Sequence, residues 1–224
     1  MRKLARISCG AVMVWLLASP APAATIDLFD YGFNVNGTVY SNSVAIPGFD
    51  ASGFDTATGL GTFTLTHNAT SAEVFYFVAF LDLEIDEALN TFFNEYGSTA
   101  NAPAAGESWE IDEPGYVFGN IYGNFVAGAL DNANAVPAAT PDDVSMALGW
   151  YLILNAGDIA TLTFSTSTTA PGSGFYLVHT DPDSVANVYF SSTETVVPTG
   201  VPEPGTLTLF GLGLLLGARR LRRR

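Results

Sequence analysis

Between residues 24 and 197 the apolar residues fall in short runs, and most of these runs alternate with polar residues. Phe63 and Leu65 alternate with threonines, which is the period of a strand with one buried face. Two runs, 74–81 and 144–154, are apolar on both parities, as expected for central strands covered on both faces. Turn residues separate the runs, and no long helical period occurs. We therefore expect one all-β domain, a β-sandwich or a jelly roll, over residues 24–197.

The same reasoning places the remaining elements. Alternation predicts further strands around 29–39, 109–112, 160–165, 174–180 and 186–193. The turn Ala156-Gly157-Asp158 predicts that the strand before it and the strand after it form a hairpin. Residues 41–59 are rich in Ser, Gly, Asp and Thr and predict a loop. Ile121, Phe125 and Ala129 have helical spacing and predict a short helix.

All eight Lys and Arg residues lie within the first six and the last six positions, whereas all 22 Asp and Glu residues lie between Asp27 and Glu203. The central domain thus has no Lys or Arg to meet phosphate groups, which excludes nucleic-acid binding. Ion pairs within the domain can only involve His67 or His179. Because crowded carboxylates repel each other, we expect raised pKa values and a stability that increases as the pH falls from neutral.

Residues 1–23 have the three parts of a secretory signal peptide. A basic start (Arg2, Lys3 and Arg6) precedes the apolar run 7–17, and small residues follow it. We expect export through the Sec machinery, with cleavage after Ala23 or Ala24. The chain's one cysteine, Cys9, lies inside this segment, so the exported domain has neither a disulfide nor a thiol.

Residues 198–224 also have three parts. The stiff motif 201–205 comes first, followed by the apolar segment 206–218 and the basic end 219–224. Pro202 and Pro204 fix their own φ and favour extended conformations before them, so Glu203 lies on a rigid strip. A helix over the apolar segment spans about 20 Å, short of the roughly 30 Å hydrocarbon core. The basic end favours the cytoplasmic side of a membrane, and it consists of Arg219, Arg220, Arg222, Arg223 and Arg224 around one leucine.

This tail resembles the PEP-CTERM sorting signal of exported bacterial proteins. The resemblance rests on Val201, Pro202, Glu203 and Pro204 directly before the short apolar segment, with arginines directly after it. Gly205 departs from the Ser or Ala that the family favours. The resemblance implies a short transmembrane helix that holds the protein at the inner membrane, and recognition and processing by the membrane enzyme exosortase. It further implies delivery to the cell surface or the extracellular space, with a role near exopolysaccharide or biofilm matrix. An ordinary C-terminal membrane anchor on a periplasmic domain is the alternative, helped by snorkelling arginines.

One group of carboxylates has the spacing of a metal site. Asp82, Glu84 and Asp86 would lie on one face of a strand, and Glu87 follows directly. Like charges at this spacing repel each other unless water or a cation separates them. Ca²⁺ suits such oxygen ligands, although the spacing differs from that of an EF-hand loop. The alternative is a solvated acidic face or loop, and the sequence requires no other cofactor.

Catalytic residues are not predicted. The chain has no Gly-x-Ser-x-Gly elbow, no lysine in the domain and only two histidines, each at a strand position typical of packing. Glu107, Glu110, Asp112 and Glu113 would supply a carboxylate pair if the domain were a glycosidase. Trp109 would then stack on a sugar ring. We therefore expect a non-enzymatic structural or adhesive component, with a carbohydrate-binding or carbohydrate-active protein as the alternative.

Overall fold

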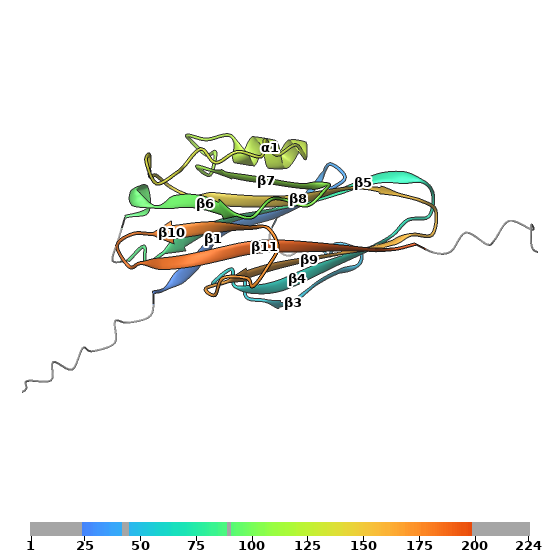
Figure 1. Cartoon of the computed structure of the whole chain (residues 1–224), viewed down its shortest axis with the longest axis horizontal. Helices are drawn as coiled ribbons and strands as arrows, with labels where there is room; N and C mark the ends of the chain where they lie inside the picture. Colours follow the sequence, from blue (N-terminus) through green and yellow to red (C-terminus); the bar gives the residue numbers. More distant parts are fainter. Residues whose placement is uncertain (1–23, 42–44, 89–90, 199–224) are drawn as a thin grey trace, which may run out of the picture.

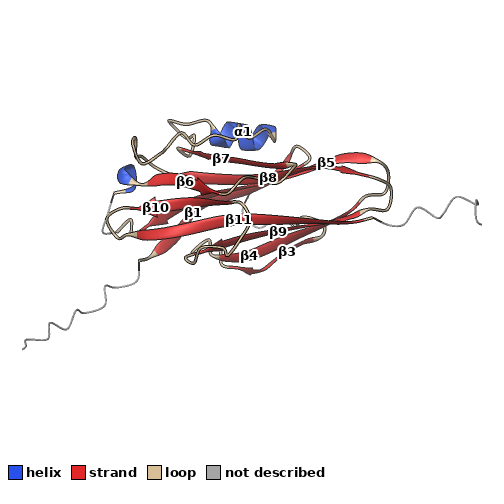
Figure 2. Ribbon diagram, in the orientation of Figure 1, coloured by secondary structure: helices blue, strands red, loops and turns tan. Residues whose placement is uncertain are grey.

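The computed structural model describes residues 24–41, 45–88 and 91–198. These residues are mostly β and form two antiparallel sheets packed face to face, with one short helix on the outside (Figures 1 and 2). This arrangement confirms the expected all-β sandwich. The predicted signal peptide, its cleavage at Ala23, and the whole C-terminal motif lie outside the described residues.

The first sheet, sheet A, has five strands with the longest one at its centre. Its order is β2 (Thr38–Ser41), β1 (Ile26–Val35), β5 (Glu73–Ile85), β8 (Ser145–Leu154) and β7 (Glu107–Asp112). The predicted central strands 74–81 and 144–154 are β5 and β8, and they pair with each other.

The second sheet, sheet B, has six strands. Its order is β3 (Phe49–Phe54), β4 (Gly61–Asn68), β9 (Ile159–Ser167), β11 (Ala186–Val197), β10 (Tyr176–Asp181) and β6 (Tyr96–Ala100). Along β9, buried residues alternate with half-buried ones without a break, which is the pattern that the sequence predicts for a strand with one face on the core.

Phenylalanines fill the space between the sheets. Phe63 and Phe164 stack with ring centroids 5.2 Å apart, and Phe77 of the opposite sheet lies 5.2 Å from Phe164. Phe33 lies 5.2 Å from Phe63. All four side chains are buried, so each contributes about 1.5–3 kcal/mol of hydrophobic stabilisation.

The outer face of sheet A carries a second apolar cluster under helix α1 (Ile121–Ala127), which lies across that face in Figure 1. Ile121 and Phe125 of the helix pack against Val78 and Phe80 of β5. This cover explains why β5 and β8 are apolar on both parities, and it confirms the predicted short helix.

Two sequence predictions about connectivity are wrong. The strands on either side of the 156–158 turn do not form a hairpin, because β8 already pairs with β5 and β7 while β9 pairs with β4 and β11. The turn instead carries the chain from one sheet to the other. Residues 41–59 are not all loop, since β3 pairs with β4 and the ring of Phe49 lies 4.7 Å from that of Phe33.

Phe29 also departs from the expected alternation. A register shift between Leu28 and Asp30 interrupts the pairing of β1 with β5, and Phe29 is 65% exposed. A bulge of this kind inserts one residue and reverses the parity of those that precede it.

The strands that the structure describes run from Ile26 to Val197 and enclose the apolar clusters of the described residues. A domain that contains its own core folds without its flanking segments, so residues 24–198 are a suitable fragment for solution experiments. Ala24 itself packs, half-buried, against the core. No helix within the described ranges has the length and apolarity needed to cross a membrane.

Candidate functional site

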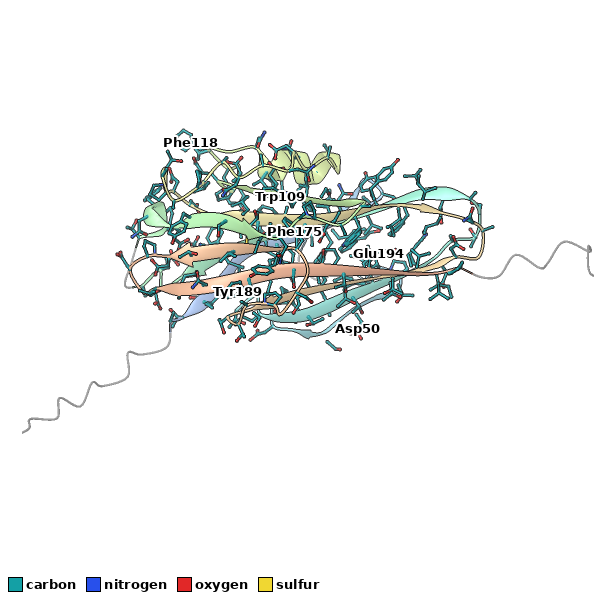
Figure 3. The ribbon with its side chains drawn as sticks, viewed as in Figure 1. Asp50, Trp109, Phe118, Phe175, Tyr189 and Glu194 are labelled. Carbon is teal, nitrogen blue, oxygen red and sulfur yellow. The ribbon has the colours of Figure 1, made fainter. Side chains whose placement is uncertain are left out.

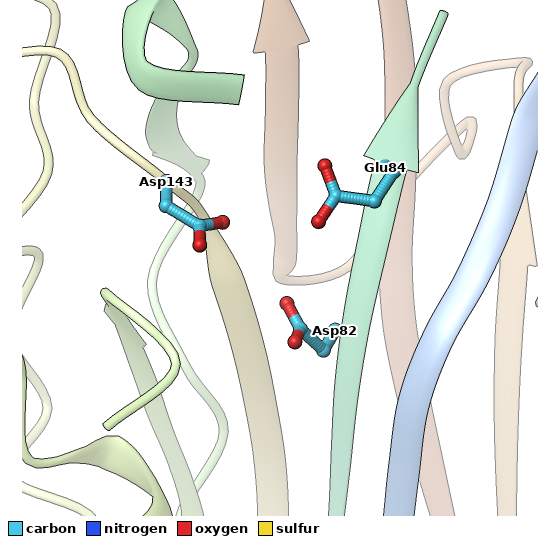
Figure 4. Close-up of side chains that lie close together, drawn as sticks. All are labelled: Asp82, Glu84 and Asp143. Atoms are coloured by element: carbon cyan, nitrogen blue, oxygen red, sulfur yellow. The ribbon is translucent and has the colours of Figure 1, made fainter. Parts of the chain in front are cut away.

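Three carboxylates converge at one end of sheet A. Asp82 and Glu84 come from the last residues of β5, and Asp143 precedes β8 by two positions. One oxygen from each residue lies within 4.8 Å of the oxygens of the other two. Figure 4 shows the three side chains turned toward one another. We call these residues the acidic cluster.

Strand pairing brings the cluster together. Asp82 is opposite Ser145 in the antiparallel β5–β8 register. Two positions further along β5 is Glu84 and two positions back along the partner is Asp143, so the side chains share a face. That face is the outer one, since Phe80 on the same parity of β5 packs under α1.

Three of the six carboxylate oxygens of the cluster are buried and have no hydrogen-bond donor in the described structure. Asp82 Oδ1 accepts a bond of 2.7 Å from the Ser145 hydroxyl. Asp82 Oδ2, Glu84 Oε2 and Asp143 Oδ1 are buried and have no partner among the residues that the structure describes. Buried polar atoms are normally hydrogen-bonded, so three unpartnered oxygens at one place single out this cluster as a candidate site.

The surroundings disfavour the ionised forms. Burial raises the pKa of Asp82 to about 7 and that of Glu84 to about 8, and the charges of neighbouring carboxylates add to both shifts. Burial, followed by the charge of Glu95, raises the pKa of Asp143 to about 6. Asp82 and Glu84 are 1% and 7% exposed. They are therefore not the solvated acidic face that was the alternative in the sequence.

Asp86, the third residue of the predicted metal site, does not join the cluster. Its Oδ1 accepts bonds from Thr25, 2.6 Å from the backbone nitrogen and 2.9 Å from the hydroxyl. Asp86 lies beyond the end of β5 with a left-handed φ of 55°, which turns it away from the strand. Asp143 takes the third place instead. Asp143 lies just before the apolar run 144–154. Its position in the sequence could predict a place in the cluster only if that run were already known to pair with β5.

Both histidine side chains contact a carboxylate. His179 Nε2 contacts the Glu95 carboxylate, and both side chains are buried. His67 Nε2 lies 2.8 Å from Glu73 Oε1 at a half-exposed position, and its ring stacks on Phe75. Within the described chain these are the histidine–carboxylate contacts that the composition allows, and His179 is buried, so its ring does not face solvent.

The carboxylates suggested for a glycosidase have structural partners. Glu110 accepts hydrogen bonds from the Asn124 side chain and the Asp131 nitrogen, and Asp112 accepts one from the Asn120 nitrogen. Glu107 accepts from the Ala104 nitrogen and from the Ser192 hydroxyl. These bonds tie β7 to α1, to the neighbouring loops and, through Ser192, to β11 of sheet B.

Trp109, the predicted sugar-stacking residue, is half-buried. Its ring packs 5.7 Å from that of Phe175, which covers the core at this point (Figure 3). Trp109 is therefore not one of the exposed aromatic side chains at this end of the molecule.

A groove opens beside the acidic cluster. It is lined by Phe92, Phe93, residues 113–118, Asp142 and Asp143. Phe93, Tyr116, Val117 and Phe118 of this lining are exposed. Asp143 belongs to both the groove and the cluster, so the groove lies directly beside the buried carboxylates.

Comparison with known proteins identifies the C-terminal segment. Residues 200–224 match the family model of the PEP-CTERM protein-sorting motif. The match covers the proline-flanked Glu203, the apolar segment and the arginines on which the sequence resemblance rests. No curated protein and no solved structure matches the chain.

Proposed function

We propose that this chain, a PEP-CTERM sorting domain-containing protein, is a non-enzymatic structural component of the extracellular matrix. The sorting motif at residues 200–224 carries the proposal, because it supports exosortase-dependent sorting to the cell envelope. Export through the Sec machinery, a transient hold on the inner membrane by the tail, and release at the cell surface complete the proposed route.

Three features of the domain favour a structural rather than a catalytic role. Its histidines are paired with Glu73 and Glu95. Its buried acids on β7 hold α1 and the adjacent loops in place. Two serine hydroxyls that donate to its carboxylates, Ser145 to Asp82 and Ser192 to Glu107, lie at buried or half-buried positions, where they bind the acids rather than a substrate.

The geometry of the tail attachment supports a surface role. β11 ends at Val197, which pairs with Ile159 at the start of β9, just after β8 ends. The acidic cluster lies at the opposite end of β8, whose ten residues span about 33 Å. A protein held by its C-terminal tail would therefore present the cluster and the groove away from the membrane.

Replacing Pro202, Glu203 and Pro204 with alanine tests the sorting route. We expect the variant to stay in the inner-membrane fraction with its C-terminus intact, whereas the unmodified protein reaches the surface without it. Cell fractionation and mass spectrometry of the C-terminus measure both outcomes. Glu194→Ala, outside the motif, is the control and should be delivered normally. Equal delivery of the triple variant would refute exosortase-dependent sorting, and an intact Arg224 in the delivered protein would favour a plain membrane anchor.

The rival function is sugar binding, which the exposed aromatic side chains of the groove favour. Glycan-array and glycoside-hydrolase screens of residues 24–198 separate it from a purely structural role. Specific binding that is lost in Phe118→Ala or Trp109→Ala, or turnover that is lost in Glu110→Gln, would support the rival. We expect neither activity in the screens.

A further inference from the structure

We propose that Asp82, Glu84 and Asp143 together bind one calcium ion on the outer face of sheet A. This calcium site belongs to the folded domain and does not depend on the sorting tail. A failure of exosortase-dependent delivery would leave it untouched.

The spacing of the oxygens fits one shared ion. Ca²⁺ binds carboxylate oxygens at about 2.3–2.6 Å, so two oxygens on the same ion lie at most about 5 Å apart. The three oxygens of the cluster lie within 4.8 Å of one another. They already have this spacing without any change of backbone, because the β5–β8 register fixes the positions of all three residues.

The unpartnered oxygens of the cluster also favour a bound cation, independently of their spacing. Glu84 is 7% exposed and its Oε2 has no donor in the described structure, while Asp82 is 1% exposed and its Oδ2 likewise has none. A buried carboxylate without a partner is costly, and one way to offset that cost is a bound cation. Figure 4 shows these side chains directed at the same point as Asp143.

No side chain of the domain can take the place of the ion. The sequence has no Lys or Arg between residues 7 and 218. Of the two histidines, His179 is held by Glu95, and His67 contacts Glu73 on another part of the molecule. The charge of His179 acts on Asp143, but His179 is already bound by Glu95, so the positive charge that balances the other carboxylates has to come from solution, as protons or as a cation.

The donor set favours calcium over other common metals. All three donors are carboxylate oxygens, whereas Zn²⁺ sites are built mostly from thiolates and imidazoles. Mg²⁺ needs a tight octahedron at about 2.0–2.1 Å, while Ca²⁺ accepts six to eight oxygens in irregular geometry. The groove borders the cluster at Asp143, and water molecules would have to supply the remaining ligands of a calcium ion.

Binding would join two segments that are far apart in the sequence. Asp82 and Glu84 belong to the end of β5, and Asp143 belongs to the loop that leads into β8. That loop also pairs with the chain after the 3₁₀ helix Phe92–Asn94, because the Asp142 nitrogen donates to the Glu95 carbonyl. We therefore expect calcium to stabilise this end of the sandwich more than the rest of it.

Thermal unfolding of residues 24–198 tests the proposal. In chelator-treated protein, calcium at about 100 times its dissociation constant should raise the Tm by about 5 °C. Magnesium and sodium chloride at equal ionic strength should raise it much less. Isothermal titration calorimetry should give one calcium ion per chain.

Two variants locate the site. Glu84→Gln and Asp143→Asn keep the shape of each side chain and should weaken calcium binding at least about tenfold. Substitutions of residues that only support the metal ligands already weaken metal binding by about that much. Glu194→Gln, on β11 of the other sheet, makes the same chemical change and should keep the full response. Circular dichroism confirms that each variant is folded before titration, and Asp143, at the edge of the groove, is the variant whose fold is least at risk.

Each possible result of these titrations either supports the calcium site or overturns it. A calcium shift that is lost in both variants and kept in Glu194→Gln supports the site. Equal shifts in calcium, magnesium and sodium would show general screening of an acidic domain and overturn the proposal. A calcium-specific shift that survives in both variants would also overturn it, because the ion would then bind elsewhere.

Discussion

At the scale of single residues, the domain buries carboxylates that no Lys or Arg can neutralise. Asp82, Glu84, Glu95 and Glu110 are all buried. Their contacts differ: Glu110 accepts hydrogen bonds from Asn124 and Asp131, and Glu95 contacts His179 through one oxygen. Glu95, Asp82 and Glu84 each keep one buried oxygen without a partner in the described structure. Predictions about pH and about the cost of substitution follow from these differences.

Glu110→Gln should flatten the dependence of stability on pH. Burial, more than the nearby charges of Asp131 and Asp112, raises the pKa of Glu110 from 4.5 to about 7. The folded protein then holds a proton that the unfolded chain releases, so this contribution to stability is complete below about pH 4.5 and is lost as the pH rises through 7. We expect the gain in unfolding free energy between pH 8 and pH 5 to shrink by about 1 kcal/mol in the variant.

Urea denaturation of residues 24–198 across this pH range, with calcium removed, measures the effect. Glu194→Gln is the matched control and should keep the slope of the unmodified domain. If the two variants lose the same amount, burial of Glu110 is not the cause.

His179→Leu should destabilise the domain strongly. The substitution leaves the Glu95 carboxylate buried without its partner, and breaking a buried pair in this way costs about 3 kcal/mol. The double variant Glu95→Leu with His179→Leu should recover part of that loss, because both polar groups are then replaced by apolar ones. Urea denaturation of the two single variants and the double variant gives the coupling energy. His67→Ala, which breaks the half-exposed pair with Glu73, should cost less than His179→Leu.

At the scale of elements, tertiary contacts decide whether helix α1 forms. Helix α1 has seven residues, too few to be stable alone in water. It is held by its apolar contacts with β5 and by Asn34 of β1, whose Nδ2 donates to the carbonyls of Phe125 at 2.7 Å and Val126 at 2.9 Å. Asn34 is thus buried on the face that the sequence alternation assigns to polar, outward residues.

Asn34→Ala should release α1 from sheet A. The variant loses both bonds to the helix and the bond that Asn34 Oδ1 accepts from the Gly37 nitrogen, so we expect a loss of about 2 kcal/mol. Hydrogen exchange at residues 121–128 should speed up more than exchange in β9, which lies in the other sheet. Asn68→Ala, at the exposed end of β4, is the control. Uniform exchange changes in both regions would contradict a specific role for Asn34 in holding the helix.

At the scale of the whole molecule, cations and anions are separated along the chain. The two ends carry all the Lys and Arg, and the sandwich lies between them with nearly all the acids. After removal of both ends, the domain would be strongly negative, which keeps it soluble and opposes compaction by self-repulsion.

Salt should therefore stabilise the isolated domain at neutral pH. Raising sodium chloride from about 0.02 M to about 0.5 M shortens the Debye length from roughly 20 Å to under 5 Å, and we expect the Tm to rise by about 3 °C. At pH 4, where many carboxylates are protonated, the increase should be smaller. Calorimetry at both pH values checks this, and an equal rise at pH 4 would point to an effect of salt other than charge screening.

The sequence by itself determined the class of the fold, the short helix and the sorting tail. Those features depend on residues that are close together in the sequence. The alternation around Phe63 and Leu65 favours a strand whichever strands it pairs with, and the motif that begins at Pro202 consists of consecutive residues. Which strands pair, and which residue is the third member of the acidic cluster, were decided only by the tertiary structure. Whether β9 pairs with β8 or with β4, and whether Asp143 or Asp86 lies beside Glu84, depends on which strand edges are already occupied and on where a strand ends. Such long-range geometry leaves little trace in the periodicity of any one segment.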